Sequence, residues 1–278
     1  MREHEIEHKT YAAAGVDLTR RQLLEMSALG AFLAACGVIP GTSATTPTGQ
    51  LMNGFTWFQQ SAFRFKGDKT FYIDPFGLAG DLTPADVIFL THIHGDHFSP
   101  DDIKKISTPQ TIQVAPKDVA DKLTGNVKIV APGDKIEVAG IKVQAVPAYN
   151  SVQARLQAHP KANNWVGYII DLPGRTIYHA GDTDNNPELQ SIKTDAALVP
   201  ISGGPFVMDP NEAAALVKAM KPRLAVPMHY GFLKFPAGAL GPGAPEVIVG
   251  KVGDGETFKT AAGIEVQILN PVNPFKNL

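Results

Sequence analysis

The sequence is poor in cysteine and has no excess of charge of one sign. Cysteine occurs once in 278 residues, which excludes an internal disulfide framework and a cysteine-rich zinc module. The 25 lysines and arginines nearly balance the 27 acidic residues, for a formal net charge of −2. This balance argues against a protein whose main partner is nucleic acid. A Gly-x-Ser-x-Gly motif is also absent, so a covalent serine mechanism has no candidate nucleophile.

Near the N-terminus, the apolar run is too short to cross a bilayer. Residues 27–35 fall well below the roughly 20 residues that a membrane span needs, and they fit the apolar part of a secretion signal. Arg20-Arg21 precedes this run and resembles a twin-arginine export signal. Leu33-Ala34-Ala35-Cys36 ends it and resembles a bacterial lipobox. We therefore expect residues 1–36 to be an export signal and Cys36 to be the lipidation site.

The next residues, 37–53, are small, polar and interrupted by proline, and we expect them to form a flexible tether. This organisation predicts an exported protein, in the periplasm or on the outer cell surface, anchored to the membrane through several acyl chains. Acidic residues before the arginine pair, and Glu25 after it, leave an alternative open. In that alternative the segment is an amphipathic first helix and the protein is cytoplasmic.

From residue 54 onward, short apolar and aromatic segments alternate with turns rich in glycine and proline, as in strands of a mixed protein. Strands are expected at 55–58, 62–65, 70–73, 87–90, 112–115, 135–138, 141–146, 165–171, 175–179, 196–200, 223–227 and 264–269. Helices are expected near residues 117–123 and after Asp209, where Pro210 and Glu212 complete a helix-start pattern. The pattern favours mixed sheets covered by helices in one α+β or α/β domain, residues 54–278.

The densest cluster of reactive side chains directly follows the expected strand 87–90. His92, His94, Asp96 and His97 fall within six residues, and a loop that leaves a strand can direct them at one or two points. Neutral imidazoles bind zinc and similar metals, and an aspartate adds an oxygen ligand. A solvated polar loop explains such a concentration of histidine poorly. The sequence therefore predicts a metal site.

This motif, His92-x-His94-x-Asp96-His97, resembles the signature of the metallo-β-lactamase superfamily. Gly181-Asp182-Thr183 and Pro227-Met228-His229 resemble its later motifs, in the expected order. Segments 146–150, 159–161 and 167–170 resemble the ascorbate-6-phosphate lactonase-like branch of metal-dependent hydrolases, which is distantly similar to N-acyl-phosphatidylethanolamine phospholipase D. The resemblance spans about residues 54–235. It implies an α+β fold, a four-layer αββα sandwich with two divalent metals at one edge.

The resemblance also implies a role for each motif residue. The first metal would be held by His92 and His94, the second by Asp96, His97 and His229, and Asp182 would bridge both. A third first-metal histidine usually follows the strand that here ends near Val146, but this sequence has Tyr149-Asn150 there. Two alternatives remain open: His159 fills the position, or Asn150 or water completes the metal. His179 is expected either to orient the site or to be a buried, hydrogen-bonded side chain.

A site of histidine and aspartate is compatible with Zn²⁺, which we expect first, or with Mn²⁺ or Fe²⁺. Hydroxide held between two such metals is expected to attack an ester, lactone, amide or phosphodiester bond. Asp96 would position or deprotonate the water, and Tyr230 would donate a hydrogen bond to developing charge or only pack. Two other functions remain open. One is a non-catalytic metal- or ligand-binding lipoprotein; the other is a redox metalloprotein, disfavoured because redox members carry glutamate in place of His94.

Loops at the same edge are expected to form the pocket. Gly203 and Gly204 expose backbone N–H groups that could bind a phosphate or carboxylate, or they form a plain turn. Phe232, with residues 233–235, could line an acyl or aromatic pocket or pack beneath the loop 236–245. The expected partner is a small-molecule or lipid-like substrate, with peripheral membrane attachment if Cys36 is lipidated.

Overall fold

The computed structural model describes residues 46–235, 237, 238, 243 and 245–275. The expected export signal, Cys36 and the tether up to residue 45 lie outside these residues. Within them, the strands form two six-stranded sheets and one separate hairpin. No helix in this part of the chain combines the length and the apolar character that a bilayer span requires.

The first sheet has its six strands in sequence order. They are β1 (Phe55–Gln59), β2 (Ala62–Lys66), β3 (Thr70–Ile73), β4 (Val87–Phe89), β5 (Ile112–Ala115) and β6 (Asn126–Ile129). Strands β1 to β3 are antiparallel, and β3 to β6 are parallel. Because β4 lies inside the parallel part, the loop that follows it opens at the carboxyl edge of this sheet.

The second sheet has the order β12-β11-β10-β9-β8-β7. Its strands are β7 (Lys135–Val138), β8 (Ile141–Pro147), β9 (Val166–Leu172), β10 (Arg175–His179), β11 (Ala196–Pro200) and β12 (Leu224–Met228). Strands β7 to β10 are antiparallel, whereas β10, β11 and β12 are parallel. The carboxyl ends of these last three strands therefore lie at one edge of the sheet.

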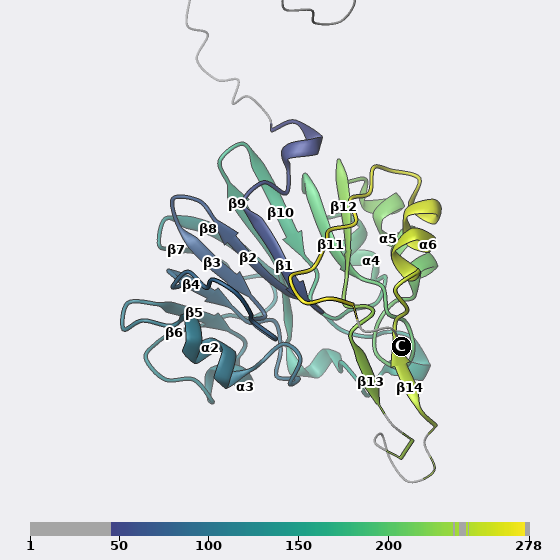
Figure 1. Cartoon of the computed structure of the whole chain (residues 1–278), viewed down its shortest axis with the longest axis horizontal. Coiled ribbons are helices and arrows are strands. Elements are labelled where there is room, and N and C mark those ends of the chain that lie inside the picture. Colours follow the sequence, from purple (N-terminus) through teal and green to yellow (C-terminus); the bar gives the residue numbers. More distant parts are fainter. Residues whose placement is uncertain (1–45, 236, 239–242, 244, 276–278) are drawn as a thin grey trace, which may run out of the picture. The chain divides into compact units, whose positions relative to one another are not determined.

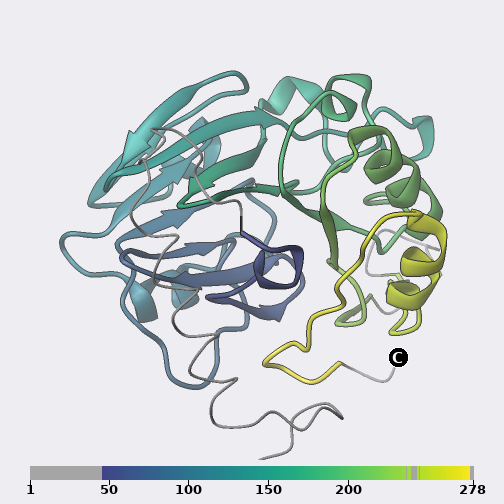
Figure 2. The ribbon, with the colours of Figure 1, turned by 90° about the horizontal axis from the view of Figure 1, so that it is seen from above.

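Helices cover the outer face of each sheet, as Figures 1 and 2 show. The helices α2 (Pro100–Ile106) and α3 (Lys117–Ala120) pack on the first sheet, and α4 (Pro187–Gln190), α5 (Pro210–Met220) and α6 (Asp254–Ala262) lie beside the second. Short 3-10 turns are η1 (Thr48–Gln50), η2 (Gln153–Arg155) and η3 (Lys161–Asn163), and β13 (Leu233–Phe235) pairs with β14 (Val247–Val249). The expected αββα sandwich is confirmed.

The alternation of side chains along each strand builds this layering. In β3, Phe71 and Ile73 pack against the inner face of the second sheet, where they meet Tyr168. Tyr72, between them, packs on the opposite face with Ile103 of α2. Because both faces are covered, strands such as β4 consist entirely of buried apolar residues. The expected capping box at α5 is present, with Asp209 accepting from the Glu212 backbone N–H at 2.9 Å.

Two expected elements differ from the structure. The strand predicted at residues 264–269 is reduced to a single bridge between Ala225 and Val266. It is so short because α6 ends at the left-handed Gly263, and the chain then touches the edge of β12 at only one point. The helix expected at residues 117–123 ends at Ala120 and continues as a turn.

The packed domain begins earlier than expected. Leu51 is fully buried and Met52 nearly so, in a cluster with Trp57 and Phe63. Arg175 donates to the backbone carbonyls of residues 50 and 53 at 2.7 and 2.6 Å. The predicted tether therefore does not extend to residue 53, because residues 48–53 are part of the domain.

Replacing Leu51 with alanine is expected to lower the free energy of unfolding by about 2–5 kcal/mol, because it leaves a cavity in the core. Chemical denaturation followed by circular dichroism measures this change. The exposed neighbour provides the control: Asn53→Ala is expected to change the same free energy by less than about 0.5 kcal/mol. Equal, small effects of the two substitutions would show that the segment does not contribute to the core.

Candidate metal centre

Histidine and aspartate side chains from four loops meet at the carboxyl edges of the two sheets. These loops follow β4, β10 and β12 or connect β8 with β9. The loop after β10 approaches β9 so closely that a Cβ at Gly181 would lie 3.0 Å from the Val166 carbonyl oxygen. Gly181 also has a left-handed φ of 62°, so a glycine is needed to place Asp182.

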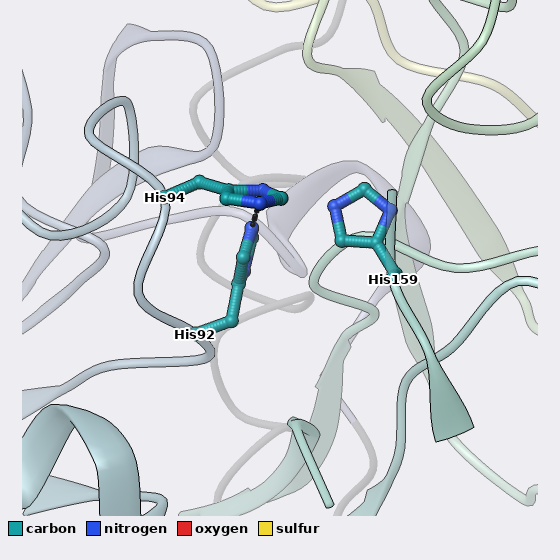
Figure 3. Close-up of side chains that lie close together, drawn as sticks. All are labelled: His92, His94 and His159. Atoms are coloured by element: carbon teal, nitrogen blue, oxygen red, sulfur yellow. Dashed lines mark hydrogen bonds between the residues drawn. The ribbon is translucent and has the colours of Figure 1, made fainter. Parts of the chain in front are cut away.

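The first group of side chains consists of His92, His94 and His159, whose candidate ligand atoms lie within 4.8 Å of one another. His92 Nε2 is 3.0 Å from His94 Nδ1. Figure 3 shows these two rings, from the loop after β4, facing His159 from the loop between β8 and β9. The third histidine thus comes from a separate segment of the chain.

His159 is oriented by Asn150, the residue considered as the alternative ligand of the first metal. The Nδ1–H of His159 donates to Asn150 Oδ1 at 2.7 Å and to the Phe206 carbonyl oxygen at 3.1 Å. His159 Nε2 consequently faces the cluster, 3.2 Å from Asp182 Oδ2, and has no hydrogen-bond partner. Of the two alternatives, the structure brings His159 to the group and leaves Asn150 behind the ring.

The second group consists of Asp96, His97 and His229. His229 Nε2 lies 3.2 Å from Asp96 Oδ2, and His97 Nε2 lies 3.8 Å from the same oxygen. Asp182 lies between the two groups. Its carboxylate oxygens are 3.2 Å from the Nε2 atoms of His159 and His229, 3.4 Å from that of His97 and 4.0 Å from that of His92.

Sequence reasoning missed Asp74, which lies directly behind the histidines. Its carboxylate accepts from His97 Nδ1–H at 2.8 Å and from the Thr91 hydroxyl at 2.7 Å. Thr91 Oγ1 in turn lies 3.0 Å from His92 Nδ1. These contacts hold both rings with Nε2 toward the cluster. The sequence did offer a signal for Asp74, because an aspartate directly follows the expected strand 70–73. In the structure this strand is β3, which pairs with β4, the strand that carries the histidine loop.

Gln60, in the turn between β1 and β2, was missed as well. Its side chain is fully buried, and its amide nitrogen donates to Asp96 Oδ2 at 3.1 Å and lies 3.5 Å from His229 Nε2. Its backbone carbonyl accepts from the His229 N–H at 2.9 Å. Gln60 therefore contacts two members of the second group. No motif marks a glutamine in a hairpin turn, so the sequence carried no signal for it.

The pKa values of His92 and His94 are lowered in the first group, and that of His229 is raised in the second group. Burial lowers the pKa of His94 to about 4 and that of His92 well below its ordinary value, which keeps these rings neutral. Burial also opposes protonation of His229, but Asp182 and Asp96 outweigh it and raise the pKa to about 9. His229 and His97 hold the pKa of Asp182 well below its ordinary range despite burial. The two ionised carboxylates thus attract positive charge to a buried site.

The arrangement fits metal ions. His97 Nε2, His159 Nε2 and Asp182 Oδ1 are buried without a hydrogen-bond partner, although such atoms are rare in proteins. His97 Nε2 lies 3.4 Å from Asp182 Oδ1, and His159 Nε2 lies 3.2 Å from the other oxygen of the same carboxylate. Imidazole nitrogens with carboxylate oxygens are a ligand set for Zn²⁺, Mn²⁺ or Fe²⁺.

Tyr230 does not reach this site, contrary to the catalytic role that was expected of it. Its ring is fully buried and stacks on Trp57 with the centroids 5.6 Å apart. A Cβ at Gly255, in α6, would lie 2.7 Å from its hydroxyl. His229 and Gly231, on either side of it, have left-handed φ values of 60° and 80°, so the chain turns here instead of continuing as a strand. Tyr230 is a packing residue.

The residues expected to bind substrate are also placed differently. The Gly203 N–H donates to the Met208 carbonyl oxygen at 2.9 Å and is used within a turn, and Gly204 is exposed. Neither glycine lines the pocket beside the histidines. Phe232 packs in the core, with its ring centroid 5.7 Å from that of Trp57.

Two further buried side chains support the site from behind. The His179 Nε2–H donates to the Ser61 carbonyl oxygen at 2.9 Å, and its Nδ1 accepts from the Gly181 N–H at 3.3 Å. His179 is therefore a buried, hydrogen-bonded residue that holds the turn before Asp182. Trp165 lies with its ring centroid 4.9 Å from that of His92 and covers the first group.

A pocket of about 300 Å³ opens beside the two groups. Its lining combines members of the polar cluster with several apolar side chains. Its lining residues are His94, Gly95, Asp96, Gln157, Ala158, His159, Asp182, Phe206, His229, Leu233, Phe235 and Val249. Residues 232–235 were expected to line a pocket. Leu233 and Phe235 of β13 line this one, and Phe232 does not.

Known proteins share this architecture. A solved structure from Parabacteroides distasonis, described as a candidate metal-dependent hydrolase, superposes with a TM-score of 0.64 at 28% identity, over 77% of this chain and 91% of that one. Igni18, a metallo hydrolase of Ignicoccus hospitalis, has a TM-score of 0.58 at 23% identity, over 78% and 94% of the two chains, and shares the fold.

Sequence comparison identifies the protein family more specifically than the shared fold does. Residues 54–229 match the family model described as a beta-lactamase superfamily domain. A UPF0173 metal-dependent hydrolase of Thermococcus onnurineus is 38% identical over 187 residues, 61% of this chain and 81% of that protein. Another, from a Polaromonas species, is 34% identical over 238 residues, 72% and 84% of the two chains. The chain therefore belongs to the metallo-β-lactamase superfamily and, within it, to the UPF0173 family of metal-dependent hydrolases.

Proposed function

We propose that the chain is a hydrolase with two adjacent divalent metals. His92, His94 and His159 hold the first, Asp96, His97 and His229 hold the second, and Asp182 contacts both. The observation that carries this proposal is the position of Asp182, whose two oxygens lie 3.2–4.0 Å from the Nε2 atoms of four histidines. The third histidine of the first group argues against a non-catalytic binding role, because His159 groups with His92 and His94.

Two divalent ions in such a site lower the pKa of water toward neutrality and polarise the bond to be cleaved. The chain's own residues supply position and proton transfer. Asp96 is the more exposed of the two carboxylates and lines the pocket, so it can orient a water molecule and accept its proton. Zn²⁺ is the first candidate, with Mn²⁺ or Fe²⁺ as alternatives. The reaction class is hydrolysis of a carboxylic ester, lactone, amide or phosphodiester.

Metal analysis of the purified chain tests the proposal. We expect about two divalent ions per chain by mass spectrometry, loss of hydrolysis of p-nitrophenyl esters after chelation, and recovery when Zn²⁺ is returned. A chain that binds no metal after reconstitution, or that hydrolyses equally well after complete chelation, would contradict it.

Replacing Gln60 with leucine is expected to weaken binding of the second metal by about 10–100-fold, because hydrogen bonds behind the ligands set their orientation. The volume is nearly retained, so a loss of affinity reports the missing amide. Zn²⁺ titration against a chromophoric chelator measures it. Gln59→Leu, one residue earlier at the end of β1, is the control and is expected to retain normal affinity. Unchanged affinity in Gln60→Leu would remove this residue from the site.

We also propose, from the sequence alone, that residues 1–36 direct export and that Cys36 is lipidated. The support is the arginine pair, the short apolar run and the position of the single cysteine. Fractionation of cells that express the native chain or Cys36→Ala tests this. The native chain is expected with the membranes, and the variant in the soluble exported fraction. Identical fractionation of the two would argue against lipidation.

A further inference from the structure

The chemistry of the pocket wall narrows the substrate class of the proposed hydrolase. Besides the polar cluster and the residues Gly95, Gln157 and Ala158, the pocket is lined by an apolar wall of Phe206, Leu233, Phe235 and Val249. The rings of Phe206 and Phe235 lie 5.6 Å apart and form a continuous apolar surface. A pocket of about 300 Å³ is at the small end of the range for small-molecule sites. It has room for about ten water molecules, or for an acyl chain of modest length.

No lysine or arginine lines this pocket within the part of the chain that the structure describes. Lys234 points away from it, because Leu233 and Phe235 alternate with it along β13, and it pairs with Glu246 at 2.9 Å. Residues 236–246, which connect β13 and β14, contain no lysine or arginine in the sequence. None of the described lining residues is therefore a lysine or arginine whose cation could compensate a negative charge on a substrate.

Arg155, a buried cation in the loop that carries His159, is already paired. Arg155 donates to Asp184 at 2.6 Å, to Glu212 at 2.8 Å and to the Val207 carbonyl oxygen at 3.0 Å. Its guanidinium group therefore fixes the loop that carries His159 and is not free for a substrate. The backbone N–H of Gly203, the expected anion donor, is also used inside its turn.

Sites for phosphate esters commonly add cationic side chains to their metals, because negative charge builds up on the phosphoryl oxygens. An uncharged acyl group needs no such partner, and an apolar wall favours it by the hydrophobic effect. We propose, on the basis of the hydrolase function above, that the substrate is an uncharged carboxylic ester or lactone whose apolar part packs on Phe206, Leu233, Phe235 and Val249.

The reaction consumes one water molecule. The water oxygen forms a bond to the carbonyl carbon, the bond from that carbon to the alcohol oxygen breaks, and the alcohol leaves with a proton. The carboxylic acid product then ionises.

A matched pair of esters tests the proposal with the metal-loaded full chain. The compounds p-nitrophenyl hexanoate and mono-p-nitrophenyl adipate have the same leaving group and chain length, and differ by a terminal carboxylate. We expect kcat/KM for the hexanoate to exceed that for the adipate by about tenfold or more, because the carboxylate would be buried unpaired. Bis(p-nitrophenyl) phosphate is expected to be the poorest of the three substrates.

Two variants link the preference to the wall. Phe235→Lys is expected to reduce the hexanoate-to-adipate ratio at least about threefold, since it supplies a cation for the carboxylate. Phe235→Leu keeps an apolar surface and is expected to retain the ratio. A native preference for the adipate or the phosphodiester would overturn the substrate class while leaving the hydrolase function intact.

If none of the three compounds is cleaved, the proposed hydrolase function is contradicted. The proposed ligand class of the pocket is then tested separately, by binding. Hexanamide and adipic acid monoamide can be compared by saturation-transfer NMR, which requires no turnover. Preferential binding of hexanamide, weakened in Phe235→Lys, would uphold the apolar pocket. Equal binding of the two amides, or stronger binding of the charged one, would overturn it.

Discussion

Replacing Asp182 with alanine is expected to remove both metals and to lower kcat/KM for p-nitrophenyl hexanoate by about a thousandfold or more, since the loss of metal-ion catalysis costs several kcal/mol. The reason is the central position of this carboxylate, which approaches histidines of both groups within 3.2–4.0 Å. No other described carboxylate contacts four histidines. Mass spectrometry of the desalted protein gives the metal content, and initial rates give the activity.

Asp171→Ala is the matched control for this experiment. Asp171 is an exposed aspartate at the end of β9, and it lies outside the cluster. It is expected to retain two metals and full activity. If Asp182→Ala kept both metals, or if Asp171→Ala lost activity to the same extent, Asp182 would not be the shared ligand.

Replacing His159 with alanine is expected to empty the first site and retain the second, so that the metal content falls from about two ions per chain to one. Loss of one of the three imidazoles in the first group should weaken its metal at least as much as loss of a supporting residue, about 100-fold or more. Zn²⁺ titration with a competing chelator resolves the two sites. Activity is expected to fall with the first metal, because both ions act on one bond.

Asn150→Ala separates the role of His159 from that of its neighbour. The Asn150 side chain touches the ring of His159 at 2.7 Å and not the cluster, so its loss is expected to weaken the first metal by only about tenfold. Lys161→Ala, an exposed change in the same loop, is expected to have no effect. A larger loss in Asn150→Ala than in His159→Ala would reverse the assignment and make asparagine the ligand.

The parts of this protein that could be predicted from sequence are those that depend on local pattern. The histidine loop directly follows a buried strand, so its four side chains were certain to leave the sheet at one edge. The hairpins at residues 135–146 and 165–179 were readable because strand alternation and turn residues occur together. The start of α5 was readable because the side chain of Asp209 bonds within its own turn. In each case the interacting residues are close in sequence.

The position of His159 and the roles of Gln60 and Asp74 depended on how distant segments pack. His159 reaches the first group because Arg155 and Asp184 fix its loop across 29 residues of sequence. Gln60 meets Asp96 and His229 only because the β1–β2 turn lies against the ends of β4 and β12. A pattern of residue types does not record such a meeting, because each contact is set by the relative placement of two sheets.

Tyr230 and Phe232 show the same limit, because the sequence suggested a role at the site that their packing does not support. Both are near His229 in sequence, which made a role at the site reasonable. The chain turns at the left-handed residues His229 and Gly231, and both rings pack on Trp57 in the core. The residue types thus predicted a metal site, and the resemblance of its motifs to a known superfamily implied the fold and the hydrolase class. Which side chains face the metals and which face the substrate was decided by tertiary packing, because the direction of a side chain follows from backbone geometry that only the assembled sheets impose.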